Sequence, residues 1–120
     1  MEFDNAQPIW QQLVTEFRYL IITGKWPSGS KIPSTRDLAL IYQVNPNTVQ
    51  RALSELDRLG DTRAERTSGR TVVMPQERIA ALRTSTAQEI LAAAVTKLKQ
   101  AGVTKQEAET IFTERWNRDD

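Results

Sequence analysis

The clearest pattern of apolar and polar residues lies between Asn45 and Gly60. Apolar residues recur there every three or four positions, which is the period of a helix with one buried face. They are Val49, Ala52, Leu53, Leu56 and Leu59. Asn45 is a favoured helix cap, Pro46 suits the first helical position, and Gly60 can adopt the left-handed conformation that ends a helix. The pattern therefore predicts a helix over residues 46–59 with well-marked ends.

The face opposite this apolar stripe is polar in the first two turns of the predicted helix. It carries Asn47, Gln50, Arg51 and Ser54. Amide and guanidinium groups at these positions are the types that reach base edges and phosphates when a helix end enters the major groove of DNA. For this helix alone, a solvated face on an ordinary amphipathic helix is the commoner explanation. Whether this face contacts DNA or is only solvated must therefore be judged from the segments on both sides of the helix.

Two helices are predicted before this one. Apolar residues at helical spacing follow Pro8 and predict a first helix over residues 8–23, and a segment dense in turn formers comes next. Ser34 precedes Asp37 by three residues, a variant of the capping box, so a short helix is expected to run to about Tyr42. Together with the helix over 46–59 it predicts a helix-turn-helix, in which Arg36 approaches the phosphate backbone. The alternative for Arg36 is a solvated charge.

A basic hairpin is predicted after Gly60. Short runs over residues 62–66 and 70–74 flank Thr67, Ser68 and Gly69, and the second run is rich in β-branched residues. The arginines gathered here are Arg63, Arg66 and Arg70. A helix-turn-helix followed by such a hairpin is a winged helix, whose small tip can enter a narrow groove or lie along phosphates. A surface hairpin with solvated arginines would be the preferred interpretation if it stood alone.

The segment after Pro75 has a different pattern. A long apolar stripe precedes Gly102, and Thr104 to Glu107 forms a full capping box for a last helix. The residues expected to form the dimer contact are Ile79, Leu82, Ile90, Leu98, Ile111 and Phe112. Residues 75–120 hold seven basic and seven acidic side chains, which favours a protein–protein surface, most simply a homodimer, over a DNA-binding tail. A break in the long helix near Thr84 is left open.

The amino-acid composition mainly excludes classes of function. Lys and Arg number 16 against 15 Asp and Glu, so only the local placement of charge can favour nucleic acid. The chain has no Cys and no His, which removes disulfides, thiol nucleophiles, imidazole acid–base chemistry and the usual zinc ligands. We expect no enzyme, no cofactor and no metal site. No apolar run approaches the roughly 20 residues of a membrane-spanning helix, so a cytoplasmic protein without a membrane partner is expected.

Two motifs resemble the GntR family of bacterial transcription regulators. The first is Ile-Pro-Ser-Thr-Arg-Asp-Leu-Ala from Ile32 to Ala39, and the second is Val-Asn-Pro-Asn-Thr-Val-Gln-Arg-Ala-Leu from Val44 to Leu53. The opening Pro-Ile-Trp at residues 8–10 and the wing tip Arg-Thr-Ser-Gly-Arg at residues 66–70 are similar to the small YtrA-type branch of that family.

The resemblance implies a mainly α protein with a small β-wing. A winged helix-turn-helix domain is expected over residues 1–74 and a two-helix C-terminal dimerisation unit over 75–120. The implied function is a sequence-specific transcription regulator, usually a repressor, that binds a pseudo-palindromic operator on double-stranded DNA as a homodimer. The DNA contacts it implies are Arg36, Asn45, Asn47, Thr48, Gln50, Arg51 and Gly69. To these the basic hairpin adds Arg63, Arg66, Ser68 and Arg70.

Two residues depart from the family pattern. Asp61 stands where an apolar residue usually follows the glycine, which puts the packing of the wing in question, and Thr71 stands where an aromatic is common. The alternative function is a dimeric helical protein–protein adaptor that kept the winged-helix fold without binding DNA; the polar side chains on the predicted helices speak against it. Because residues 75–120 form a short segment, we expect no separate effector domain and no large ligand cavity. The identity of any small-molecule effector stays open.

Overall fold

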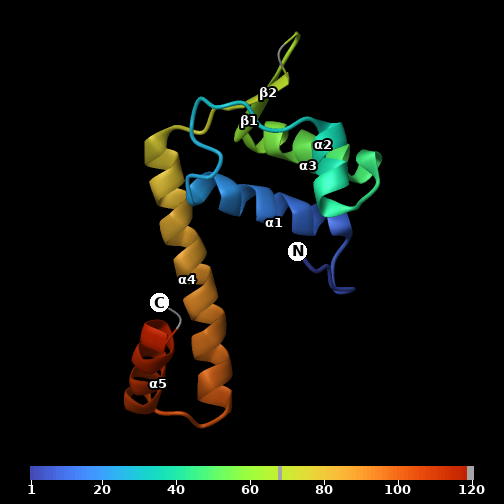
Figure 1. The fold of residues 1–120 in the computed structure, drawn as a ribbon. Helices are drawn as coiled ribbons and strands as arrows, with labels where there is room; N and C mark the ends of the chain where they lie inside the picture. Colours follow the sequence, from blue (N-terminus) through green and yellow to red (C-terminus); the bar gives the residue numbers. More distant parts are fainter. Residues whose placement is uncertain (68, 119–120) are drawn as a thin grey trace. The chain divides into compact units, whose positions relative to one another are not determined.

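A computed structural model of the protein describes residues 1–67 and 69–118. The elements, in chain order, are α1 (Ile9–Ile22), α2 (Thr35–Tyr42), α3 (Pro46–Leu59), β1 (Thr62–Glu65), β2 (Gly69–Val72), α4 (Gln76–Gln100) and α5 (Lys105–Arg118) (Figure 1). The chain divides into two compact units, Met1–Leu82 (unit 1) and Arg83–Asp120 (unit 2), which are described separately. The prediction of a mainly helical protein with a small two-stranded wing is confirmed.

The core of unit 1 is built from the apolar stripes predicted for α1 and α3. Leu13 and Phe17 of α1 and Val49 and Leu56 of α3 are fully buried. Burying a side chain of this kind stabilises a fold by about 1.5–3 kcal/mol, so these few residues hold α3 firmly against α1. Phe17 also contacts Trp26, with 5.2 Å between the ring centroids, and thereby fixes the loop after α1.

The helix ends follow the predicted caps. The Ser34 hydroxyl accepts a hydrogen bond from the Asp37 amide at 3.0 Å, and the Asn45 side-chain oxygen accepts one from the Asn47 amide at 2.7 Å. Gly60 ends α3 with φ of 81°, in the left-handed region that glycine adopts without strain. The turn between α2 and α3 is tight because Gln43 is also left-handed, with φ of 55°.

The wing is an antiparallel pair in which Thr62 lies opposite Val72 and Glu65 lies opposite Gly69. The chain before α2 adds a single bridge at its edge, between Lys31 and Thr71. This bridge joins the segment before α2 to strand β2 of the wing.

Asp61 is fully buried at the junction of α3 and β1, although it is charged. Arg18 of α1 donates to its carboxylate at 2.7 and 3.2 Å, and Arg78 of α4 donates to it at 2.7 Å. Arg78 also donates to the main-chain oxygens of Leu59 and Gly60 at the end of α3. The packing of the wing, questioned from the sequence, is thus secured by two arginines that replace the usual apolar contact.

The start of α4 belongs with unit 1. Ile79 lies in its core with an exposed fraction of 5%, and Leu82 packs against that core. The helix continues without the break considered near Thr84. In unit 2 the capping box of α5 is formed, since Thr104 and Glu107 exchange hydrogen bonds at 3.0 and 3.2 Å. Among the described residues, no helix combines the length and apolarity needed to cross a membrane.

Candidate nucleic-acid interface

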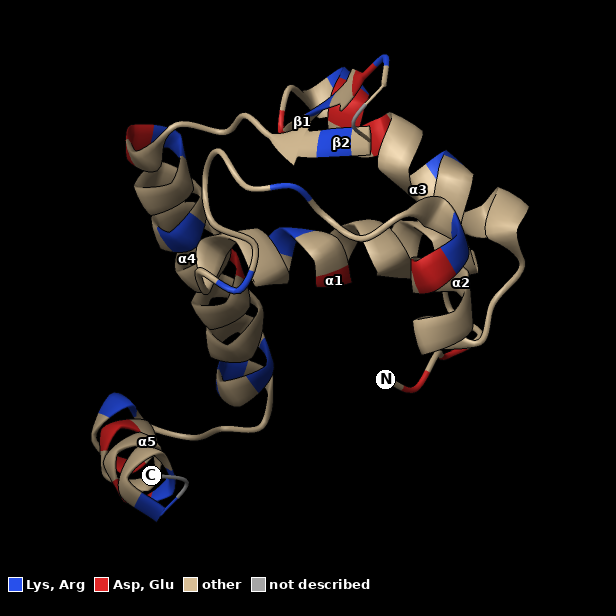
Figure 2. Ribbon diagram, turned by 45° about the horizontal axis from the view of Figure 1, so that its top comes forward, with Lys and Arg blue, Asp and Glu red and all other residues tan. Residues whose placement is uncertain are grey.

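The N-terminal face of α3 presents the polar side chains predicted to contact DNA. Asn47, Gln50 and Arg51 are exposed, and Thr48 is half-buried. Their backbone is fixed because the apolar side of the same turns is buried against α1 and α2. Lys and Arg residues, blue in Figure 2, occur on α2, α3 and the wing. The helix therefore offers polar groups from a rigid base, as DNA readout through a helix end requires.

The Gln50 amide is held by hydrogen bonds at the solvent surface. Its oxygen accepts a hydrogen bond from the Thr35 hydroxyl at 3.1 Å, and its nitrogen donates one to the Ser54 hydroxyl at 3.4 Å. An amide oxygen has two lone pairs and an amide nitrogen two N–H groups, so one acceptor and one donor stay free. These are the two functions with which glutamine recognises adenine.

Arg51 lies against an aromatic ring. Its guanidinium carbon is 4.3 Å from the centre of the Trp10 ring, in the first turn of α1. The sequence placed Trp10 only in a family motif and did not connect it with Arg51. The periodicity of each helix shows which side is buried, but not which turns of two helices lie side by side.

Arg36 and Asn45 lie at the two helix starts of the helix-turn-helix. Arg36 is exposed in the first turn of α2, as a phosphate contact requires. The side-chain oxygen of Asn45 is engaged in capping α3, which leaves its NH₂ group to donate.

The wing arginines differ in their partners. Arg66 is exposed, and Arg63 pairs with Glu65 at 3.1 Å at the surface. Arg70 is only 13% exposed and forms an ion pair with Asp57 of α3 at 2.9 Å. Arg70 therefore fastens the wing to α3, and its predicted contact with DNA stays a prediction.

Two predicted contacts lie at the wing tip. Gly69 is exposed, with φ of 85°, which a residue with a side chain would adopt only with strain. Ser68 lies outside the described residues.

Comparison with known proteins identifies the fold. A family model described as bacterial regulatory proteins of the gntR family matches residues 10–72. The HTH-type transcriptional regulator YhcF of Bacillus subtilis (strain 168) is 33% identical over 106 residues, which cover 88% of this chain and 88% of YhcF. This chain belongs to the GntR family.

Two further proteins extend the similarity. A GntR family transcriptional regulator from Listeria monocytogenes superposes with a TM-score of 0.86 at 28% identity, covering 93% of this chain and 98% of that one. The HTH-type transcriptional repressor YtrA of Bacillus subtilis (strain 168) is 41% identical over 56 residues, which cover 47% of this chain and 43% of YtrA. This GntR-family chain is accordingly a DNA-binding transcription regulator, and such regulators are generally not enzymes.

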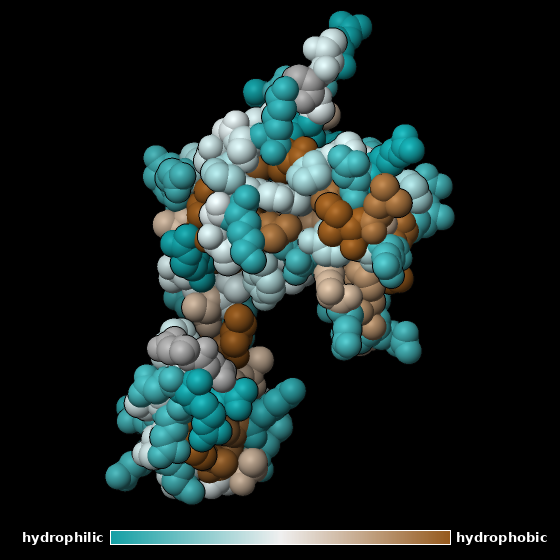
Figure 3. All heavy atoms as spheres, viewed as in Figure 1, coloured by the Kyte–Doolittle hydropathy of each residue, from teal (hydrophilic) through white to brown (hydrophobic). Residues whose placement is uncertain are grey.

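The residues expected to form a dimer lie in both units of this GntR chain. Ile79 is only 5% exposed in the core of unit 1 and so offers little surface to a partner. Leu82 is half-buried against that core, and its place in a dimer contact stays a prediction. Three residues of unit 2 are exposed, namely Ile90 (57%), Ile111 (60%) and Phe112 (53%). Leu98 is half-buried. Figure 3 shows hydrophobic residues, in brown, at the surface of unit 2 between hydrophilic ones.

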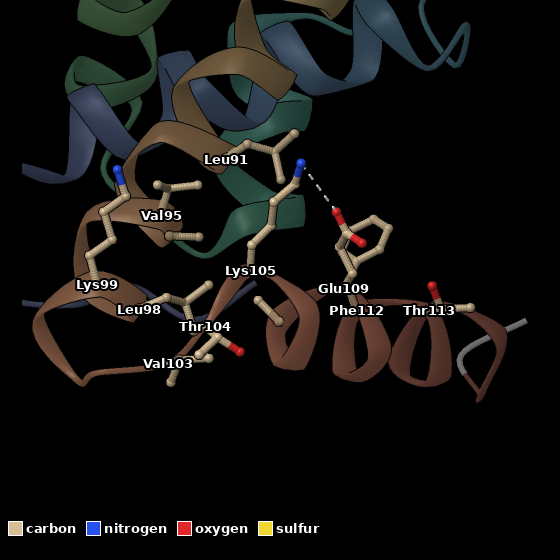
Figure 4. Close-up of a pocket in the computed structure, with 12 residues that line it drawn as sticks. Leu91, Val95, Leu98, Lys99, Val103, Thr104, Lys105, Glu109, Phe112 and Thr113 are labelled. Atoms are coloured by element: carbon tan, nitrogen blue, oxygen red, sulfur yellow. Dashed lines mark ion pairs between the residues drawn. The ribbon is translucent and has the colours of Figure 1, made fainter.

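A groove of about 760 Å³ lies between α4 and α5 within unit 2. Figure 4 shows Leu91 and Val95 of α4 and Phe112 of α5 along it, and Lys105 pairs with Glu109 at 3.7 Å beside it. The sequence predicts no large ligand cavity in residues 75–120, so a groove of this volume is unexpected. The structure differs because the apolar faces of α4 and α5 do not close on each other.

Proposed function

We propose that this protein is a homodimeric repressor that binds a pseudo-palindromic operator. The polar N-terminal face of α3 carries the proposal, because Asn47, Gln50 and Arg51 are exposed on a helix whose opposite side is fully buried. In each protomer α3 would enter the major groove, Arg36 would contact a phosphate and the wing would lie beside the helix. Similarity to the repressor YtrA supports repression over activation.

The apolar surface of unit 2 supports the homodimer. Its exposed large apolar residues are Ile90, Leu91, Val95, Ile111, Phe112 and Trp116. Soluble monomers rarely expose so many apolar side chains on so small a unit, and a second copy would cover them. A two-fold dimer would address two half-sites about one helical turn of DNA apart, so the operator should be pseudo-palindromic.

Selection of bound fragments from random duplex DNA tests the proposal directly. We expect one sequence with two inverted half-sites to be enriched. Gln50→Ala should weaken binding to it by roughly 1–3 kcal/mol and relax the preference at one base pair of each half-site. Lys97→Ala, which also shortens an exposed side chain but lies in unit 2, is the matched control and should bind like the wild type.

Other outcomes would test the two-fold dimer, the DNA binding and the repression separately. Enrichment of a single half-site without inverted symmetry would contradict the two-fold dimer on DNA. No enrichment by a protein that is dimeric in solution would favour the protein–protein adaptor. Transcription in vitro from a promoter that overlaps the selected site should fall as protein is added, and a rise would contradict repression.

A further inference from the structure

Arg51 differs from the other arginines of unit 1 that have a described partner. Those that pair with carboxylates are Arg18, Arg58, Arg63, Arg70 and Arg78. Within residues 1–67 and 69–118, no carboxylate lies at ion-pair distance from Arg51. Its described partner is the ring of Trp10, 4.3 Å from the guanidinium carbon.

The partner of Arg51 affects DNA binding because DNA is an anion with many hydrogen-bond acceptors. A carboxylate beside Arg51 would occupy its N–H donors and would have to be displaced before a phosphate or a base edge could bind. An aromatic ring attracts the cation through its quadrupole and is a poor acceptor, so the donors stay free. The ring also limits the rotamers of a long side chain, so less conformational freedom remains to be lost on binding.

The Trp10 side chain is held in a fixed position. It is half-buried in the first turn of α1 and packs against the core that contains Leu13 and Val49. Because α1 and α3 are joined through this core, the ring keeps its position relative to the second turn of α3, where Arg51 is attached.

We propose that Trp10 is a positioning residue for DNA recognition: its ring holds the Arg51 guanidinium in place before DNA arrives. The inference rests on the proposed DNA contact of Arg51. Trp10 need not touch DNA itself; it acts through Arg51 and therefore only at the base pair or phosphate that Arg51 contacts.

A double-mutant cycle on the selected operator tests this. Trp10→Leu should weaken operator binding about threefold, the size expected for an exposed cation–π contact. The same change should cost nothing further in an Arg51→Ala background. Trp10→Phe keeps an aromatic face and should bind between the wild type and Trp10→Leu. It also keeps the test valid if Trp10→Leu does not fold. Cooperative thermal unfolding of each variant, recorded first, shows which of them fold.

The outcomes distinguish this inference from the function on which it rests. If Arg51→Ala binds like the wild type, Arg51 does not contact DNA, and both the proposed contact and the role of Trp10 are wrong. If Arg51→Ala weakens binding but changing Trp10 costs the same in both backgrounds, the ring has only a structural role and the inference alone is wrong. Tighter binding by Trp10→Leu or Trp10→Phe would show that the ring withholds Arg51 from DNA, which also overturns it.

Discussion

Arg70 of the wing and Asp57 of helix α3 form a two-point ion pair. The Nε of Arg70 donates to Oδ1 of Asp57 at 3.0 Å, and its Nη2 donates to Oδ2 at 2.9 Å. The Thr62 hydroxyl donates to the same carboxylate at 2.6 Å. Asp57 thus joins both wing strands to the helix, and the pair sets the position of the wing before DNA is bound.

Asp57→Ala should therefore loosen the wing. Losing a two-point, partly buried pair should lower the free energy of unfolding by about 1–2 kcal/mol, because Arg70 and Thr62 both lose an acceptor. Chemical denaturation measures the loss, and faster hydrogen exchange of the β1 amides locates it. Glu65→Ala breaks the exposed pair with Arg63 and is the matched control, for which we expect less than about 1 kcal/mol. Equal losses in the two variants would contradict this role of Asp57.

Asp61→Ala should be more damaging than Asp57→Ala. It leaves Arg18 and Arg78 without the buried carboxylate between them, and breaking such a buried pair costs about 3–5 kcal/mol. Both arginines keep some contact with water, so the lower end of this range is expected. Thermal unfolding of Asp61→Ala and of Asp61→Leu measures the effect. Asp61→Leu, which restores the apolar type usual for the family, should be more stable than Asp61→Ala because it leaves a smaller cavity. A loss in Asp61→Ala no larger than that in Asp57→Ala would contradict this role of the buried carboxylate.

The ion pairs of Asp57 and Asp61 could not be predicted from the sequence. The helices were predictable because their apolar period and, for α2, α3 and α5, their capping residues are local features. Asp61 was recognised as a departure, but its partner Arg18 lies 43 residues away, and no local pattern connects them. The link between Trp10 and Arg51 was missed for the same reason. Ile79 was assigned to a dimer surface because its stripe continues along α4, whereas the structure buries it in unit 1.

Phe112→Asp should convert the proposed dimer into a monomer. A carboxylate placed in the apolar surface of unit 2 would be buried without a partner on association, and this cost opposes the dimer. Light scattering at micromolar concentration measures the mass. Leu40→Asp alters a similarly exposed apolar residue in unit 1 and is the control that should stay dimeric. A wild-type protein that is already monomeric would contradict the dimer itself.

Operator binding should weaken steeply with salt. Each phosphate contact contributes about 0.9 to the slope of log affinity against log salt concentration, because a bound counterion is released. Arg36→Ala and Arg66→Ala should each lower this slope by about one unit for every phosphate that the arginine binds in the wild-type complex. Fluorescence anisotropy at several salt concentrations gives the slope, with Lys97→Ala as the reference. A weaker affinity with an unchanged slope would assign either arginine to a contact other than phosphate.

Stability in alkaline solution should depend on Tyr42. Burial of its ring, and then the charge of Glu16 and the hydrogen bond to it at 3.1 Å, raise the pKa of Tyr42 from 10.0 to about 12. The folded state thus favours the protonated phenol. Its contribution to stability is fully present below the unfolded pKa of about 10 and is lost as the pH rises through the folded pKa near 12.

The measurement is the free energy of unfolding of the wild type and of Tyr42→Phe between pH ~9 and ~12. Phenylalanine does not titrate, so the stability of the wild type relative to this variant should fall steadily across that window. Glu16→Gln removes the nearby charge but keeps an oxygen that can accept the phenol hydrogen bond. The folded-state pKa of Tyr42 should therefore be raised less, and the loss of stability should be complete at a lower pH. If the difference in the free energy of unfolding between wild type and Tyr42→Phe does not change with pH, Tyr42 has the same pKa in the folded and unfolded states. Its protonated phenol would then not stabilise the packing of α2 against α1 through Glu16.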